Sequence, residues 1–98
     1  MTILETRNDD CLTLALEGRL DTITAPELEA VLNRHLPTIR NLTLDFEKLE
    51  YISSAGLRVL LYAQGSLEGK GEVKICNANE LVKEVFDVTG LAELLNIV

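Results

Sequence analysis

The stretch that decides the fold lies at residues 44–61, which read LDFEKLEYISSAGLRVLL. It begins with apolar residues that alternate as in a strand, and it ends in an apolar run with helical spacing. Between the two patterns, Ser53, Ser54, Ala55 and Gly56 stand where the helix begins. A serine at a helix start can accept a hydrogen bond from a free backbone N–H, and small residues let another molecule approach the backbone. The stretch therefore predicts a strand, a serine-capped helix start and an accessible backbone.

The two serines fit either of two roles. In the first, they only cap the helix, and the small residues pack under a neighbouring element. In the second, one serine is a phosphorylation site, and its phosphate brings about −1.5 to −2 charges at pH 7. The N–H groups at a helix start accommodate that charge within the chain, whereas at an interface it repels acidic or apolar partner surface. The second role predicts a switch in binding without a change of fold.

Strand and helix patterns alternate on both sides of this stretch. Strands are predicted at residues 2–7, 11–17, 41–46 and 73–76, the first two as a hairpin, with a strand-like tail at 97–98. Helices are predicted at residues 24–36, 53–67, 79–89 and 91–95. Alternating strands and helices imply parallel crossovers. The predicted fold is α/β, one domain over residues 1–98 with a mixed four- to five-stranded sheet packed by about four helices.

The ends of the predicted helices carry local signals. Thr24 is predicted as the N-cap of the first helix, with Glu27 as its capping-box partner, and residues 18–23 are predicted as a connection. Residues 77–79, Asn-Ala-Asn, are predicted to cap the third helix. The inner face of that helix is predicted to carry Leu81, Val82, Val85 and Phe86.

Composition narrows the class of protein. The 98 residues are 47% apolar and 26% charged, which is typical of a globular domain with its own core. No apolar run approaches the roughly 20 residues that span a bilayer. The first ten residues are polar and acidic and carry no secretory leader, so a cytoplasmic location away from membranes is expected. Cys11 and Cys76 lie in strand-like runs and are predicted to be buried, reduced thiols.

The charge of the chain restricts its partners. Sixteen acidic residues against nine basic ones give a net charge of −7. Such a domain repels phosphate backbones and anionic membrane surfaces, so direct binding of nucleic acid or membrane is not expected. The charge suits a basic protein partner, although solubility alone explains it equally well.

No catalytic motif is complete. A nucleophile elbow needs glycine two residues before and two after the serine, and Ser54 has Gly56 but also Ile52. The only histidine, His35, lies beside the apolar stripe of a helix, where a structural or surface role is expected. Residues 65–71 read GSLEGKG, one residue short of a phosphate-binding loop and without its final Ser or Thr. We predict no enzyme, no cofactor and no metal site.

Three motifs, in order along the chain, resemble a known family. Residues 18–25 read GRLDTITA, like the pattern Gly-x-Leu-Asp-x-x-Thr-Ala, and residues 85–91 read VFDVTGL, like Val-Phe-x-x-Thr-Gly-Leu. Residues 45–61 resemble the strand, loop, serine pair, glycine and apolar helix between them. Together they cover essentially the whole chain and are similar to STAS domains, specifically bacterial anti-sigma factor antagonists.

The resemblance implies a function and its partners. Such antagonists bind an anti-sigma factor that is also a serine kinase of the GHKL ATPase fold, and binding releases a sigma factor that activates transcription. The kinase phosphorylates a serine at the start of the second helix, which ends the interaction, and a PP2C-type phosphatase reverses the modification. The domain is a substrate and a ligand, with no catalytic role.

Carried over to this chain, the phosphoacceptor falls on Ser54, with Ser53 as second choice. Sporulation-type antagonists have aspartate before the acceptor and often serine after it, whereas Ser53 and Ala55 stand there in this sequence. Asp21 matches an aspartate that contacts a basic residue of the kinase, although it also fits an ordinary turn aspartate before a helix. Parallel crossovers are expected to bring Asp21 and Ser54 to one end of the sheet. The implied partner-binding residues are Asp21, Thr22, Thr24, Ser53, Ala55, Gly56 and Arg58.

Two other functions are compatible with the same fold. One is a STAS subunit of a lipid-transport or transporter-regulating complex, in which the interaction is constitutive and the serines are only caps. The other is nucleotide binding by the domain itself. The acidity of the chain and the incomplete phosphate-binding loop disfavour nucleotide binding.

Overall fold

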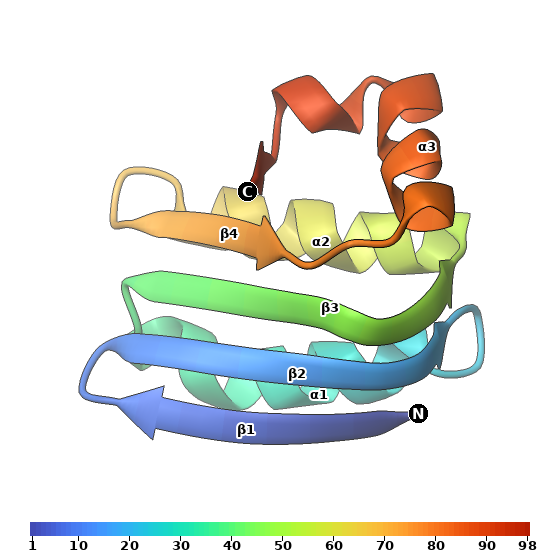
Figure 1. The fold of residues 1–98 in the computed structure, drawn as a ribbon. Helices are drawn as coiled ribbons and strands as arrows, with labels where there is room; N and C mark the ends of the chain where they lie inside the picture. The colour runs from blue at the N-terminus through green and yellow to red at the C-terminus, as the bar shows by residue number, and fades with distance from the viewer.

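A five-stranded sheet runs through the computed structural model, which describes residues 1–98 (Figure 1). Its strands lie in the order β1-β2-β3-β4-β5; β1 and β2 are antiparallel and the remaining pairs are parallel. The elements are β1 Thr2–Asn8, β2 Cys11–Leu20, α1 Ala25–His35, β3 Asn41–Ile52, α2 Ser54–Leu67, β4 Glu72–Cys76, α3 Glu80–Thr89 and β5 Asn96–Ile97, with 3-10 turns η1 Leu36–Thr38 and η2 Leu91–Glu93. The predicted mixed α/β fold and its opening hairpin are confirmed.

The helices are fewer than expected. Three α-helices form, and the fourth one predicted at residues 91–95 is only the single 3-10 turn η2. Gly90 ends α3 in a left-handed conformation at φ 77°. Beyond η2, Asn96 pairs with Lys74 of β4, so too few residues remain for a further α-helix.

The molecule has two main layers. Helices α1 and α2 lie side by side behind the sheet, and α3 and η2 lie beyond β4 at one edge (Figure 1). The face of the sheet toward the viewer in Figure 1 has no helix over it. The covered face carries the alternating apolar residues of the strands, among them Leu12, Leu14 and Leu16 of β2, which are fully buried. No helix of the structure is both long and apolar enough to cross a membrane.

Both central strands are longer than the sequence predicts. Strand β2 continues through residues 18–20, which were expected to be a connection, and β3 continues past Phe46 to Ile52. Register shifts between β2 and β3 at Ala15/Glu17 and Gly18/Arg19 accompany a break in the two-residue alternation of β3, where the buried residues after Phe46 are Leu49 and Ile52. In β3 the extra residues remove the period that marks a strand, and in β2 the positive-φ Gly18 interrupts the apolar run, so both sequence patterns stop before the ladder does.

The predicted inner face of α3 is partly wrong. Val82 and Phe86 are fully buried, and the Phe86 ring stacks at 6.5 Å, centroid to centroid, from Phe46 of β3. Leu81, however, is 51% exposed. Helix α3 lies at the edge of the sheet in Figure 1, so only a narrow stripe of the helix meets the core.

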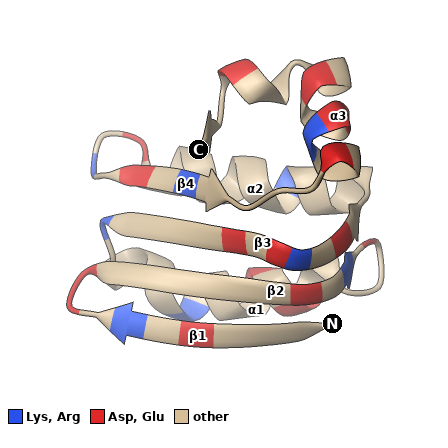
Figure 2. Cartoon of the chain, viewed as in Figure 1, with Lys and Arg blue, Asp and Glu red and all other residues tan.

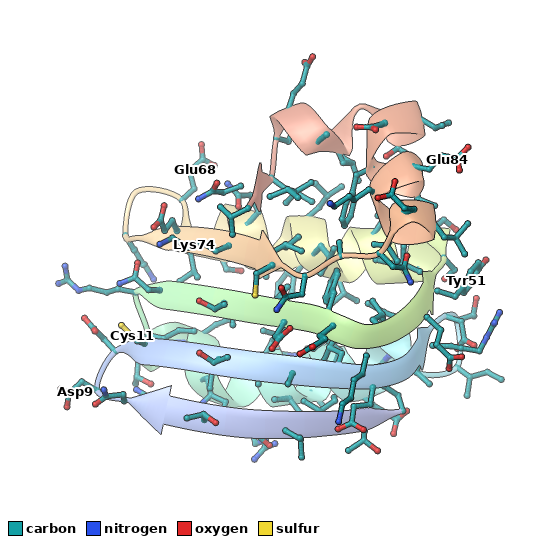
Figure 3. The ribbon with its side chains drawn as sticks, in the orientation of Figure 1. Asp9, Cys11, Tyr51, Glu68, Lys74 and Glu84 are labelled. Atoms are coloured by element: carbon teal, nitrogen blue, oxygen red, sulfur yellow. The ribbon has the colours of Figure 1, made fainter.

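The two cysteines are free but not buried as predicted. Cys11 is exposed and Cys76 is half-buried. Both belong to the strand residues that alternate with the core residues, so they lie on the face without helices, where Cys11 is visible in Figure 3. Burial, with the Asp45 and Glu47 carboxylates nearby, raises the pKa of the Cys76 thiol.

The single histidine joins α1 to the edge strand β1. His35 Nε2 lies 2.8 Å from Oε1 of Glu5, and its Nδ1 lies 3.1 Å from a guanidinium nitrogen of Arg7. Arg34 donates to the other oxygen of Glu5 at 3.1 Å. The hydrogen bond with His35 and the charge of Arg34 lower the pKa of Glu5. The structure thus places His35 in a network that holds the sheet edge against a helix.

Candidate partner-binding site at the ends of β2 and β3

The candidate site lies where two parallel neighbouring strands end. Leu20 of β2 pairs with Ile52 of β3, and the N–H of Ser53 donates to the carbonyl of Leu20 at 2.9 Å. The loop that begins at Asp21 and the start of α2 at Ser54 are therefore neighbours, at the right of Figure 1. This confirms that Asp21 and Ser54 come to one end of the sheet.

Asp21 closes the start of α1. Its Oδ1 accepts from the N–H groups of Ile23 at 3.0 Å and Thr24 at 3.1 Å, and its carbonyl accepts from the N–H of Ala25 at 2.8 Å. In return, Thr24 Oγ1 accepts from the N–H of Asp21 at 2.9 Å and donates to the carbonyl of Arg19 at 2.7 Å. This reciprocal arrangement is a capping box with Asp21 in the capping role.

The expected Thr24–Glu27 capping box is therefore wrong. Thr24 has a helical backbone, at φ −92° and ψ −21°, and its side chain accepts no hydrogen bond from the N–H groups of α1. The capping residue lies three positions earlier, because residues 22–24 already form the first turn, with Asp21 accepting from Ala25.

The environment of Asp21 favours its charged form. The N–H of Thr24 has the largest effect, and with Ile23 and the nearby Arg19 it lowers the pKa of Asp21. Oδ2 accepts no hydrogen bond; it lies 4.0 Å from Nε of Arg19, whose guanidinium sits 4.3 Å over the ring of Tyr51. The Asp21 side chain is 30% exposed. One carboxylate oxygen thus holds α1, and the other remains available to a cation.

The start of α2 has no side-chain cap. Ser53 occupies the N-cap position in extended conformation, yet its hydroxyl accepts no hydrogen bond from the helix. The Oγ of Ser53 is buried and has no partner, whereas Ser54, the first residue of α2, is exposed. The expectation that one of these serines caps the helix is thus wrong in the structure, and the first-turn N–H groups lack a side-chain acceptor.

Gly56 packs against the interior of the molecule, and its backbone is not accessible to another molecule. It is buried, and a Cβ added to it would lie 2.7 Å from Cγ of Leu20 and 2.8 Å from Cγ1 of Ile52. Real Cβ atoms do not approach that closely. The glycine therefore seats α2 against the ends of β2 and β3, which corrects the prediction that the backbone is accessible there.

A hollow of about 300 Å³ separates the first turns of α1 and α2. Arg58 lines it and is the only charged residue of α2, marked by a single blue band in Figure 2. The hydroxyl of Tyr62 donates to Asn33 of α1 and so links the two helices. Lining residues are Thr22, Ala25, Pro26 and Glu29 from the α1 side and Ala55, Arg58, Val59 and Tyr62 from α2.

The structure divides the residues proposed from sequence into groups. Thr22, Ala55 and Arg58 share the hollow, Asp21 and Thr24 form the capping box, and the two serines and the glycine form the start of α2. Sequence reasoning missed Pro26, Glu29 and Tyr62. Tyr62 falls one turn after Arg58 on the same helix, a spacing that offered a signal.

Two named relatives are similar to this chain over nearly its whole length. A protein of Bordetella bronchiseptica named as a candidate anti-sigma factor antagonist, BtrV, is 36% identical over 91 residues, covering 91% of this chain and 78% of its own. The anti-sigma-B factor antagonist of Staphylococcus aureus is 27% identical over 99 residues, covering 99% of this chain and 92% of its own.

Solved structures agree in fold. The Bacillus antagonist SpoIIAA in its unphosphorylated form superposes with a TM-score of 0.87 at 20% identity, over 99% of this chain and 88% of its own. Its phosphorylated form gives 0.78 at 19% identity, over 99% and 91%. The STAS domain of a SulP transporter from Vibrio cholerae gives 0.69 at 23% identity, over 94% and 75%. The family model described as the STAS domain matches residues 3–98, and this chain therefore belongs to the STAS domain family.

Proposed function

We propose that this chain is an anti-sigma factor antagonist controlled by phosphorylation of Ser54. It binds an anti-sigma factor that is a GHKL-type serine kinase in the cytoplasm and thereby releases a sigma factor. Phosphorylation ends the complex, and a PP2C-type phosphatase restores it. The observation that carries this proposal is an exposed serine on the uncapped start of α2, next to the ionised Asp21.

The comparisons support the proposal at a coarser level. Two relatives are named for antagonism of an anti-sigma factor, and SpoIIAA, which shares this fold, exists in a phosphorylated form. The domain itself acts as substrate and ligand. The proposed interface joins Asp21, Ser54 and the hollow between α1 and α2.

Exposure favours Ser54 over Ser53 as acceptor. In the transfer, the Oγ of serine forms a bond to the γ-phosphorus of ATP, the bond from that phosphorus to ADP breaks, and the hydroxyl proton passes to a base of the kinase. Such in-line attack needs an oxygen that the kinase can reach. Ser54 is exposed, whereas the Oγ of Ser53 is buried and would require α2 to move.

The modification acts at an interface and leaves the fold in place. The phosphate adds about −1.5 to −2 charges at pH 7, and the unpaired N–H groups and positive end of α2 stabilise it within the chain. In the complex the same group opposes acidic or apolar partner surface, and it disturbs the pairing of Asp21 with a partner cation. Losing one buried charged pair costs about 2–5 kcal/mol.

The first test is phosphorylation by the kinase anti-sigma factor that copurifies with the chain. Incubation with ATP followed by mass spectrometry is expected to place one phosphate on Ser54. Ser54→Ala should abolish the modification, and the matched control Ser53→Ala should retain it. Absence of phosphate from both serines would overturn the switch, and phosphate on Ser53 would overturn the assignment.

A second measurement tests the consequence for binding. Ser54→Asp is expected to weaken the kinase complex about 30-fold or more while leaving the unfolding temperature nearly unchanged. Ser54→Asn is the control, because asparagine has nearly the size of aspartate but carries no charge. Equal affinity of the wild-type chain and Ser54→Asp would contradict the proposal.

The alternative is a STAS subunit that binds a transport complex constitutively. It is favoured by the likeness in fold to the SulP transporter domain. Copurification separates the two functions, because one predicts a kinase and the other a permease or transport ATPase. In the second case Ser54→Asp is expected to leave the association intact.

A further inference from the structure

Arg58 stands apart from the other arginines of the chain. The guanidinium groups of Arg7, Arg19, Arg34 and Arg40 all contact a carboxylate, a carbonyl or an aromatic ring. Arg58 is exposed and makes no hydrogen bond or ion pair, in a chain with sixteen acidic residues against nine basic ones. A cation left unpaired among so many acids is available to an anion that arrives later.

The position of Arg58 identifies that anion. Ser54 and Arg58 lie four residues apart in α2, so they are neighbours on one face, with Cβ atoms about 5–6 Å apart. Side chains in a helix lean toward its N-terminus, and the Arg58 side chain therefore extends toward the turn that carries Ser54. Both residues are exposed. In the unmodified chain Ser54 offers Arg58 only a neutral hydroxyl.

We infer that Arg58 binds the phosphate of phosphorylated Ser54 as an intramolecular clamp, an inference that rests on the function proposed above. A guanidinium matches two phosphate oxygens in a bidentate pair. The N–H groups at the uncapped start of α2 approach the same phosphate from the helix axis. The modified serine is thus held between the helix end and the guanidinium.

The clamp changes the docking surface in a second place. Arg58 now lines the hollow between α1 and α2, where Glu29 is the one acidic lining residue, yet the two form no ion pair. Pairing with the phosphate withdraws the guanidinium toward the start of α2. Modification of Ser54 therefore adds negative charge at the helix start and removes the only charged group of α2 from the hollow.

Phosphorus NMR tests the clamp without any kinase. Phosphoserine is incorporated at position 54 during translation, and the second pKa of its phosphate, ordinarily about 6, is measured by titration. Arg58→Ala is expected to raise that pKa by roughly 0.3 unit, the equivalent of one helical ion pair. Arg58→Lys should restore part of the difference, because it keeps the charge but not the bidentate geometry.

The matched control is Arg40→Ala. It removes the same charge from the residue before β3, whereas Ser54 follows the other end of that strand. It is expected to leave the phosphate pKa unchanged. Equal effects of Arg58→Ala and Arg40→Ala would overturn the clamp. If Arg58→Ala leaves the phosphate pKa unchanged and the unphosphorylated variant binds the kinase more weakly, the clamp is also overturned and Arg58 is assigned to an acid of the partner. Failure of the kinase to modify Ser54 would contradict the proposed function only, because the phosphoserine here is encoded.

Discussion

Helices α1 and α2 begin beside each other, yet their first turns are built in opposite ways. The start of α1 is closed, because Asp21 and Thr24 satisfy each other and the N–H groups of the first turn. The start of α2 is open, because the hydroxyl of Ser53 is buried without a partner and caps nothing. In the closed start, the N–H groups of Ile23, Thr24 and Ala25 are all bonded to Asp21. An open start retains donors for an anion, which is the property that a phosphorylation site requires.

The difference has a structural cause. The N–H of Ser53 continues the sheet by donating to Leu20, so the chain enters α2 directly from the strand. The loop before α1 has three further residues in which to fold back on Asp21. Helix α3, which follows a short loop after β4, is also closed, because Asn79 accepts from the N–H of Val82 at 2.8 Å. The open start is therefore specific to α2.

The largest expected effect comes from filling the space under the start of α2. Gly56→Ala places a methyl group against Leu20 and Ile52 and is expected to lower the free energy of unfolding by about 1–3 kcal/mol. The control is Gly65→Ala in the same helix, where no atom lies within 4 Å, and it should stabilise by about 0.5–1 kcal/mol. Denaturant unfolding measures both. Similar values for the two variants would show that Gly56 does not seat α2.

Opening the closed start of α1 is expected to have the next largest effect. Thr24→Val keeps the shape but loses the bonds to Asp21 and to the carbonyl of Arg19, at a cost of about 1–2 kcal/mol in unfolding free energy. Thr22→Val is the control, because the Thr22 hydroxyl is exposed and makes no hydrogen bond in the structure. A cost as large for Thr22→Val would contradict the capping box.

The charge of Asp21, which closes the start of α1, should make the stability of the chain depend on pH. Because the folded-state pKa of Asp21 lies below the unfolded value of 3.8, its stabilisation is complete above that pH and disappears as the pH falls through the folded pKa. The stability difference between the wild-type chain and Asp21→Asn should therefore be constant from pH 7 to about 4 and shrink below that. Denaturant unfolding at several pH values measures it. A stability difference that persists unchanged to pH 2 would show that the ionised carboxylate of Asp21 does not contribute to the cap.

The smallest effect is expected at the open start itself. Ser53→Ala removes a hydroxyl without a partner, so it should change the unfolding free energy by less than about 0.5 kcal/mol or slightly stabilise the chain. Asn79→Ala removes a working cap and should cost about 1 kcal/mol. If Ser53→Ala proved as costly as Asn79→Ala, Ser53 would cap α2 in solution and the contrast between the helix starts would fail.

Sequence reasoning worked where the signal is local. The small residues of the α2 start, a cap within residues 77–79 and the opening hairpin all follow from neighbouring residues, and the structure contains each of them, with Asn79 as the capping residue. It was less accurate for the ends of β2 and β3, because the register shifts break the alternation of β3 and Gly18 interrupts the apolar run of β2. Glu29 and Tyr62 escaped notice because their helices meet only after the sheet brings them together.

The sequence by itself determined the order of elements, the mixed sheet and the serine-rich start of α2. These depend on periodicity and turn chemistry, which act over a few residues. Only the tertiary structure decided that Ser54 is exposed while the Ser53 hydroxyl is buried, that Asp21 closes α1, and that Arg58 has no partner. Burial and pairing depend on which strands and helices become neighbours, and in this chain that is settled by β2 and β3 ending side by side.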